Sequence, residues 1–211
     1  TDKKINGKKY GFDKYGRMIA SWYSNDLAKG SASKASTGEA TYSNSFMYFS
    51  SPEDGARYTK GWFKVVPGYY LHQSKYEDDA DYWYYANGDG NILANRVKKI
   101  KGKTYGFDEY GRMISGLALI KYDGTSDSDG ELIEKIADDD SALPYDTEDA
   151  FNETAMTRIA SELADGTYRF MYFSGSDDGA MKTGRQTIDI DGESFSFKFQ
   201  TKSNVKGAGV T

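Results

Sequence analysis

The chain contains no cysteine and a single histidine, His72, among its 211 residues. Without cysteine, a disulfide framework, a thiol nucleophile and a zinc–thiolate site are all excluded. One histidine cannot supply a metal site built from two histidines, and a Ser–His–Asp triad would depend on His72 alone. Because no nucleophile motif surrounds any serine, we expect His72 to be a strand or loop residue rather than a general base.

Long apolar runs and blocks of like charge are also absent. No apolar stretch approaches the ~20 residues of a membrane-spanning helix. Basic residues are mixed with acidic ones, the formal net charge is −5, and no basic stripe of the kind that binds nucleic acid is present. We therefore expect neither a membrane span nor a nucleic-acid partner.

Acidic residues are numerous, but their spacing indicates neither a metal site nor a catalytic pair. The acidic segment 123–140 fails the EF-hand pattern, because Ile136 stands where a bidentate glutamate is needed. Nothing singles out a pair of carboxylates for glycoside hydrolysis. We expect no metal, no cofactor and no catalytic residue.

Aromatic residues and glycine are abundant instead. The chain has 18 Tyr, 11 Phe and 23 Gly, while its hydrophobic fraction of 38% lies below the usual 45–50% of a globular domain. This composition argues against a deep aliphatic core. It favours short strands, many tight turns and half-buried aromatic faces.

Two internal repeats are the strongest feature of the sequence. Residues 5–19 recur as residues 100–114 with only three of fifteen positions changed. A second unit, Phe46–Ser50 followed by Asp54-Gly55-Ala56, recurs as Phe170–Ser174 followed by Asp178-Gly179-Ala180, and a looser copy begins at Trp83. A last segment, from Ile190, resembles the opening of the first unit. Similarity of this kind indicates a repeat architecture.

Each unit has an aromatic strand, then a turn rich in Asp, Asn and Gly, then a short second strand. Gly16 and Gly111 stand where a hairpin turn often needs a positive φ, and Asp13 and Asp108 suit the entry to that turn. Because an isolated hairpin is marginal in water, such units should stack and bury each other's aromatic faces. The predicted fold is mostly β, a solenoid-like array of stacked β-hairpin repeats with one helical insert.

The order of the units predicts two related halves, 1–99 and 100–211. The predicted hairpins lie near 5–23, 46–65 and 80–99 in the first half, and near 100–120, 167–190 and 190–210 in the second. An insert at 121–166 should hold the helix, at about 147–163, with Thr147 as its N-cap and Asp165-Gly166 as its end. Since the chain begins at Thr1 and ends in mid-pattern, we expect it to be a segment of a larger protein.

Four stretches carry a family resemblance: Gly61-Trp62, Trp83-Tyr84-Tyr85 with the turn that follows, Tyr105–Asp108 with Gly111, and Tyr10–Asp13 with Gly16. Their pattern resembles the cell-wall-binding repeat family, which includes choline-binding repeats of surface proteins and autolysins, glucan-binding repeats of glucansucrases and repeats of large clostridial toxins. The Gly-Trp element of that family is intact only at Gly61-Trp62. Ser21-Trp22, Gly116-Leu117 and Gly184-Arg185 stand at the equivalent places, so the chain resembles a divergent member.

The resemblance implies aromatic boxes shared between neighbouring hairpins. Such a box holds a quaternary ammonium group by cation–π attraction, and the same ring faces could stack on sugars. Only one stretch could supply a box, and its candidate residues are Trp62, Trp83, Tyr85 and Tyr105, with Trp22, Tyr15 and Tyr110 as secondary candidates. The alternative for each of these rings is packing between repeats.

The resemblance therefore implies a non-catalytic cell-wall or glycan-binding repeat module that anchors a secreted bacterial surface protein. Its partner would be a cell-wall polymer, such as choline-bearing teichoic acid, or a glycan, and its place would be the bacterial cell surface. The alternative is a structural or adhesin scaffold module that binds a protein partner, with the helical insert carrying the contact.

Overall fold

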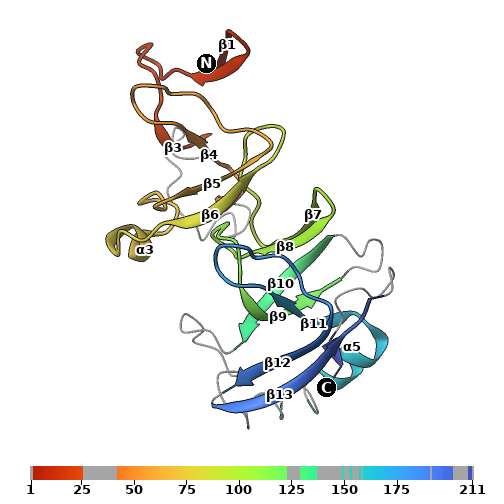
Figure 1. Ribbon diagram of the computed structural model, residues 1–211. Coiled ribbons are helices and arrows are strands. Elements are labelled where there is room, and N and C mark those ends of the chain that lie inside the picture. The colour runs from red at the N-terminus through yellow and green to blue at the C-terminus, as the bar shows by residue number, and fades with distance from the viewer. Residues whose placement is uncertain are drawn as a thin grey trace. The chain divides into compact units, whose positions relative to one another are not determined.

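The computed structural model describes residues 2–25, 42–122, 129–136, 149, 153, 157, 159–190, 192–201 and 209–210. Short strands dominate these ranges and form two compact units (Figure 1). The first unit contains Thr1–Asn95 and Phe107–Met113, and the second contains Arg96–Gly106 and Ile114–Thr211. No helix in the described part of the chain is both long enough and apolar enough to span a membrane.

The first unit contains three two-stranded antiparallel sheets (Figure 1). Their strands are β1 (Asp2–Ile5), β2 (Lys8–Gly11), β3 (Ser21–Ser24), β4 (Phe46–Phe49), β5 (Gly61–Val65) and β6 (Tyr82–Ala86), and the short helix α3 (Gln73–Glu77) precedes β6. β1 and β2 are joined by Asn6-Gly7, whose φ angles of 49° and 83° are those that a two-residue type I′ turn requires.

The turn after β2 is built on one carboxylate, as its Asp and Gly predicted. Asp13 Oδ1 accepts the backbone N–H groups of Tyr15 (2.8 Å) and Arg17 (2.9 Å), and Oδ2 accepts Arg17 Nε at 2.7 Å. Gly16 has a φ of 80°, which confirms the predicted left-handed position. Although desolvation acts to raise it, these hydrogen bonds hold the pKa of Asp13 below its usual value.

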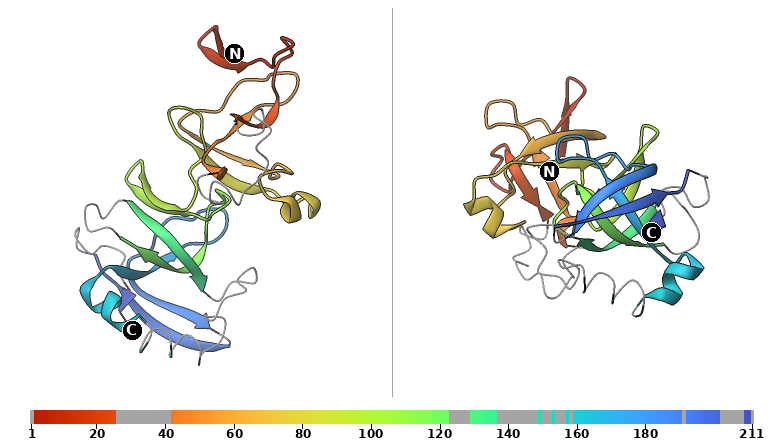
Figure 2. Two further views of the ribbon diagram at one scale, coloured as in Figure 1. Left: turned by 180° about the vertical axis from the view of Figure 1, so that it is seen from behind. Right: turned by 60° about the horizontal axis from the view of Figure 1, so that its bottom comes forward.

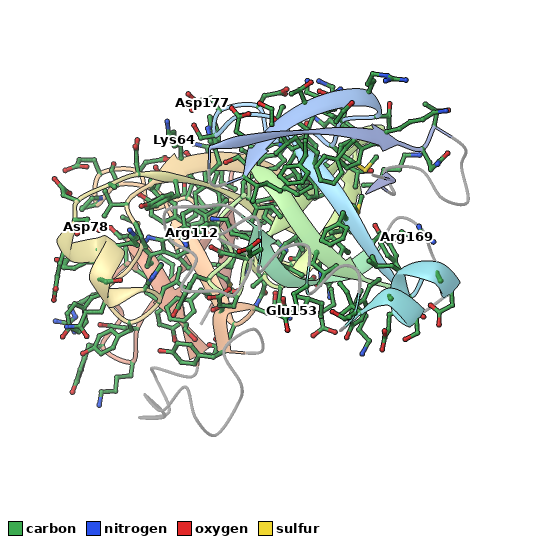
Figure 3. The ribbon with its side chains drawn as sticks, turned by 90° about the horizontal axis from the view of Figure 1, so that it is seen from below. Lys64, Asp78, Arg112, Glu153, Arg169 and Asp177 are labelled. Atoms are coloured by element: carbon green, nitrogen blue, oxygen red, sulfur yellow. The ribbon has the colours of Figure 1, made fainter. Side chains whose placement is uncertain are left out.

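The second copy of this turn has the same hydrogen bonds but a different environment. Asp108 accepts the N–H groups of Tyr110 (2.9 Å) and Arg112 (2.8 Å) and the Arg112 Nε at 2.7 Å. The Arg112 and Asp108 side chains are only 9% and 3% exposed, whereas the equivalent arginine and aspartate of the first copy are 75% and 27% exposed. Arg112 lies over the Tyr82 ring at 4.9 Å, inside the first unit, while Asp78, the residue after α3, lies at its edge (Figure 3).

The core of the first unit is aromatic. β3–β4 and β5–β6 turn one face each into a cluster of buried residues, against which Trp22, Tyr48, Val65 and Tyr82 pack. The buried members are Tyr42, Phe46, Phe63, Leu71, Tyr84, Ala86 and Ile92. Aromatic rings thus supply the apolar area that the few aliphatic residues cannot, as the composition predicted.

Tyr84 lies fully buried in this core, and its Oη has no hydrogen-bond partner among the described residues. Burial raises the pKa of Tyr84 well above its usual value of 10.0. The folded state therefore holds this proton more tightly than the unfolded state, so stability should fall as pH rises above about 10. We expect Tyr84→Phe to weaken this alkaline loss and to raise stability at pH 7 by about 1 kcal/mol.

Urea unfolding of both proteins between pH 7 and pH 11 measures this effect, with exposed Tyr70→Phe as the control. A Tyr84→Phe protein less stable than the parent at pH 7 would show that the hydroxyl is satisfied in solution.

The second unit is built on larger sheets. One sheet has the strand order β11-β9-β10-β7-β8, and another has the order β12-β13-β14; β12 and β13 lie side by side in both views of Figure 2. The strands are β7 (Arg96–Ile100), β8 (Lys103–Phe107), β9 (Gly116–Lys121), β10 (Asp129–Ile136), β11 (Tyr168–Phe173), β12 (Gly184–Ile190), β13 (Glu193–Phe199) and β14 (Gly209–Val210).

β9 organises the second unit, because both of its faces are buried. Leu117 and Leu119 belong to one hydrophobic cluster, while Ala118 and Ile120 belong to another. Alternate residues of a strand point to opposite faces, so a continuous apolar run is typical of a central strand covered on both sides. β9 thus adds four consecutive aliphatic core residues to a chain rich in aromatics.

The predicted helix at 147–163 lies largely outside the described residues, as does its predicted N-cap at Thr147. The described helix is α5 (Ala160–Asp165), which ends at Gly166 in the left-handed conformation with a φ of 81°. The predicted end at Asp165-Gly166 is therefore confirmed, but α5 begins only at Ala160, after the non-helical Ile159, so a single helix running through 159 to 163 is not observed. Arg169 lies beside this end and donates from Nε to the Gly166 carbonyl at 3.3 Å (Figure 3).

The structure confirms a mostly β chain of short hairpins but pairs some strands differently from the sequence prediction. Residues 46–65 and 80–99 do not form self-contained hairpins, since β4 pairs with β3 and β5 pairs with β6. Inside the first stretch a single bridge pairs Phe49 with Arg57, and inside the second a single bridge pairs Ala86 with Ile92. The observed pairs β3–β4 and β5–β6 instead bring their aromatic residues into one buried cluster. Stacking of the hairpins into a solenoid-like array stays a prediction.

Candidate functional site: an aromatic face on the β5–β6 hairpin

The β5–β6 hairpin has aromatic side chains on both of its faces. The register places Trp62 opposite Tyr85 and Lys64 opposite Trp83, so these four residues share one face. The intervening residues Phe63 and Tyr84 point to the other face and into the core. Alternation over two neighbouring strands therefore leaves Trp62, Trp83 and Tyr85 on the side away from the core. We call these three residues the aromatic face.

The rings of the aromatic face lie edge to face. The Trp62 ring centroid is 5.1 Å from that of Tyr85, with an interplanar angle of 71°, and 6.4 Å from that of Trp83, with an angle of 84°. Trp62 also stacks on the buried Phe107 ring at 5.6 Å. All three residues of the face are half-buried. The Trp62 ring is thus packed against a buried ring, while all three residues keep part of their surface accessible.

Backbone hydrogen bonds hold the aromatic face in place. The Met113 N–H donates to the Trp83 carbonyl at 2.8 Å. At the end of the hairpin, Asn87 Oδ1 accepts the N–H groups of Asp89 (2.9 Å) and Asn91 (3.1 Å), and Gly90 adopts a φ of 91°. A site carried on paired strands with a capped turn is organised before any ligand arrives.

Tyr105, the fourth residue of the predicted box, lies half-buried on β8 in the second unit. The structure brings the other three residues together in the first unit. The membership of Tyr105 in a box stays a prediction.

Trp22 lies in the aromatic core rather than on the aromatic face. Its ring centroid is 4.9 Å from that of Tyr84 and 5.3 Å from that of Tyr48, and its Nε1 donates to the Val66 carbonyl at 2.8 Å. A Cβ on Gly68 would come within 2.9 Å of the Trp22 ring, so the backbone presses directly on the indole. This position explains the residue as packing, and a role in binding stays a prediction.

Tyr15 and Tyr110, equivalent in the two turns, differ in what covers them. Tyr15 is 71% exposed, with Lys14 Nζ 4.9 Å and Arg17 Cζ 5.3 Å from its ring centroid. Tyr110 is half-buried and stacks on the His72 ring at 3.7 Å, with an interplanar angle of 8°. His72 is buried just before α3, which places the single histidine in a packing contact.

The aromatic face is suited to binding rather than to proton transfer. Its charged neighbour on the same strands is Lys64, and its rings offer polarisable surface and indole N–H donors. No group of three His, Asp or Glu residues that could hold a metal ion occurs in the described ranges. The geometry can hold a cationic or sugar-like group against the rings.

A second exposed aromatic surface was missed by the sequence analysis. Tyr69, Tyr70 and Tyr76 are all exposed, and the Tyr69 ring lies edge to face with Tyr70 at 5.2 Å and with Tyr76 at 5.6 Å. The signal in the sequence was a Tyr-Tyr pair directly after Pro67-Gly68. We call these three residues the tyrosine cluster.

Comparison with solved structures finds choline-binding proteins. The chain is similar to a choline binding domain from Streptococcus pneumoniae (21% identity, TM-score 0.33), with 54% of this chain and 92% of that chain covered. It is similar to choline binding protein F of the same organism (16%, TM-score 0.46), with 99% and 40% covered. It is similar to the modular autolysin LytC of that organism (14%, TM-score 0.33), with 100% and 33% covered.

The chain thus spans well under half the length of the two larger proteins. No protein-family model matches the chain, and a search of curated proteins finds no match. The similar structures belong to the class that the sequence resemblance had named, choline-binding repeat proteins.

Proposed function

We propose that the chain is a non-catalytic binding module that attaches a secreted bacterial surface protein to a cell-wall polymer or glycan. The observation that carries this proposal is the aromatic face, where the Trp62 ring centroid lies 5.1 Å from that of Tyr85 and 6.4 Å from that of Trp83 on paired strands. Choline-bearing teichoic acid is the partner that the sequence resemblance implies.

Two kinds of ligand group fit this face. A quaternary ammonium group gains about 0.5–2 kcal/mol when placed over an aromatic ring. A sugar ring can instead lie against the same rings with its apolar edge. Either contact is weak alone, so attachment to a polymer would depend on several sites acting together through their effective concentration.

Tryptophan fluorescence tests the proposal. Trp22, Trp62 and Trp83 all lie in the first unit, so the signal reports on that unit alone. We expect saturable quenching by choline, by a soluble α-glucan or by wall fragments, and loss of at least tenfold in affinity in Trp83→Ala, because one of three rings is removed.

Tyr70→Ala is the matched control, since it removes an exposed aromatic ring outside the aromatic face. Quenching by choline alone favours the ammonium ligand, and quenching by glucan alone favours the sugar ligand. No response to any of the three ligands would leave the aromatic face without a role in attachment.

A second candidate function is a scaffold that binds a protein partner. The tyrosine cluster favours it, because exposed tyrosines lying together are enriched at protein interfaces. The helical insert that was expected to carry such a contact lies mostly outside the described residues. If Tyr70→Ala rather than Trp83→Ala abolishes attachment to bacterial cell walls, the scaffold function replaces the first proposal.

A further inference from the structure

A basic groove of about 480 Å³ lies between the β1–β2 hairpin and the turn that follows β4. Lys4, Lys8, Lys9 and Arg57 line it, together with Asp54. The two sides are fixed to each other, because the Arg57 N–H donates to the Lys9 carbonyl at 2.8 Å. We call it the basic groove, and it is separate from the aromatic face.

The positive charges of this groove exceed the carboxylates beside them. Lys8 Nζ pairs with Asp54 at 3.2 Å, and Arg57 Nη1 pairs with Asp2 at 2.9 Å. Lys4 and Lys9 stand directly opposite each other across β1 and β2, where like charges are destabilising. Within the described ranges, neither ammonium has an acidic partner. Two positive charges therefore remain in a chain whose formal net charge is −5.

The side chain of Arg57 is unusually buried for a charged residue. Its side chain is only 6% exposed, and its Nε is buried with no hydrogen-bond acceptor among the described residues. A Cβ on Gly90 would lie 2.8 Å from this Nε, so the close approach of Gly90 makes room for the guanidinium. A charge buried to this degree costs free energy that must be offset by its partners.

The repeat supplies an internal comparison. In the second copy, the Met181 N–H donates to the Thr104 carbonyl at 2.8 Å, the bond that Arg57 and Lys9 make in the first copy. The glycines that close the two turns have the same φ of 62°. The backbone is thus repeated, but the second copy has Thr in place of Lys9 and Met in place of Arg57. The two cations are not needed to form the turn.

We propose that the basic groove binds phosphate groups of a polymer built from polyol phosphates or sugar phosphates. Clustered ammonium groups beside a guanidinium form strong charge-assisted hydrogen bonds to phosphate oxygens. The groove is far larger than one phosphate and falls within the usual range for small-ligand sites, and Tyr58 adds an exposed ring to its wall. A short basic site on an acidic chain fits a few phosphates, not the long basic stripe that nucleic acid requires.

Calorimetric titration of the whole chain with a glycerol-phosphate oligomer at low ionic strength tests this assignment. The informative variant is Lys9→Thr/Arg57→Met, which installs the residues of the second copy. We expect its affinity to fall at least tenfold, and the affinity of the parent to fall steeply with added salt. Lys9→Thr alone, at an exposed position, should show a smaller loss in the same direction.

The matched control is Arg185→Met/Lys198→Thr, which removes the same two charges from an exposed cross-strand pair of β12 and β13. It should bind as the parent does, and inorganic phosphate should compete with the oligomer for the parent. Equal affinity of the parent and the groove variant, or an equal loss in the control, would overturn the site. Tighter binding of a single-stranded oligonucleotide with the same number of phosphates would overturn the polymer class.

Discussion

Replacing Asp108 by alanine is expected to lower the free energy of unfolding of the first unit by about 3–5 kcal/mol. The substitution removes the carboxylate that accepts two backbone N–H groups and the Arg112 Nε. It also removes the carboxylate that pairs with the buried guanidinium of Arg112 at 2.7 Å. Urea unfolding followed by tryptophan fluorescence measures the loss, because all three tryptophans lie in the first unit.

The chain contains its own control for this prediction. Asp13→Ala deletes the same set of hydrogen bonds in the first copy of the turn, where Arg17 is solvated and keeps its hydration. Its effect should be much smaller than that of Asp108→Ala, since exposed ion pairs contribute little. Losses of equal size in the two variants would show that the hydrogen bonds of the turn, rather than burial of the charges, set its stability.

The second large effect is expected for Leu71→Ala, at about 3 kcal/mol. Leu71 is 0% exposed and lies in the aromatic core of the first unit, next to the buried His72 that stacks on Tyr110. A cavity here should loosen the segment that carries the tyrosine cluster. The same unfolding measurement applies, with a shift in the denaturant midpoint as the readout.

Tyr70→Ala is the natural comparison, because Tyr70 adjoins Leu71 in the chain but is 55% exposed. We expect it to change stability by less than about 0.5 kcal/mol. A large loss of stability in Tyr70→Ala together with a small loss in Leu71→Ala would contradict the assignment of Leu71 as the buried residue and Tyr70 as the exposed residue of this segment.

Local features of the fold could be predicted from the sequence. The duplicated Asp and Gly positions indicated two hairpin turns, and the structure shows both with the expected positive φ at Gly16 and Gly111. These turns depend on residues near one another in the chain, where turn chemistry applies directly. The grouping of Trp62, Trp83 and Tyr85 was implied by the family resemblance, and the pairing of β5 with β6 that joins them was not predicted.

Long-range features could not be predicted from the same patterns. β3 pairs with β4 across a long insert, and the choice of partner depends on which faces bury the most ring area in three dimensions. The central position of β9 depends on cover supplied by distant strands. The basic groove needs Lys9 and Arg57 side by side, and their separation in sequence hides that proximity.

The segment Phe107–Met113 belongs to the first unit although it follows β7 and most of β8 of the second. It contributes Phe107, which supports the Trp62 ring, and Asp108, whose carbonyl accepts the Asn95 N–H at 2.7 Å. A gene fragment cut at the apparent repeat boundary, after residue 99, would encode the aromatic face without its support. When this module is grafted or recombined with another, the junction should therefore be placed after Met113.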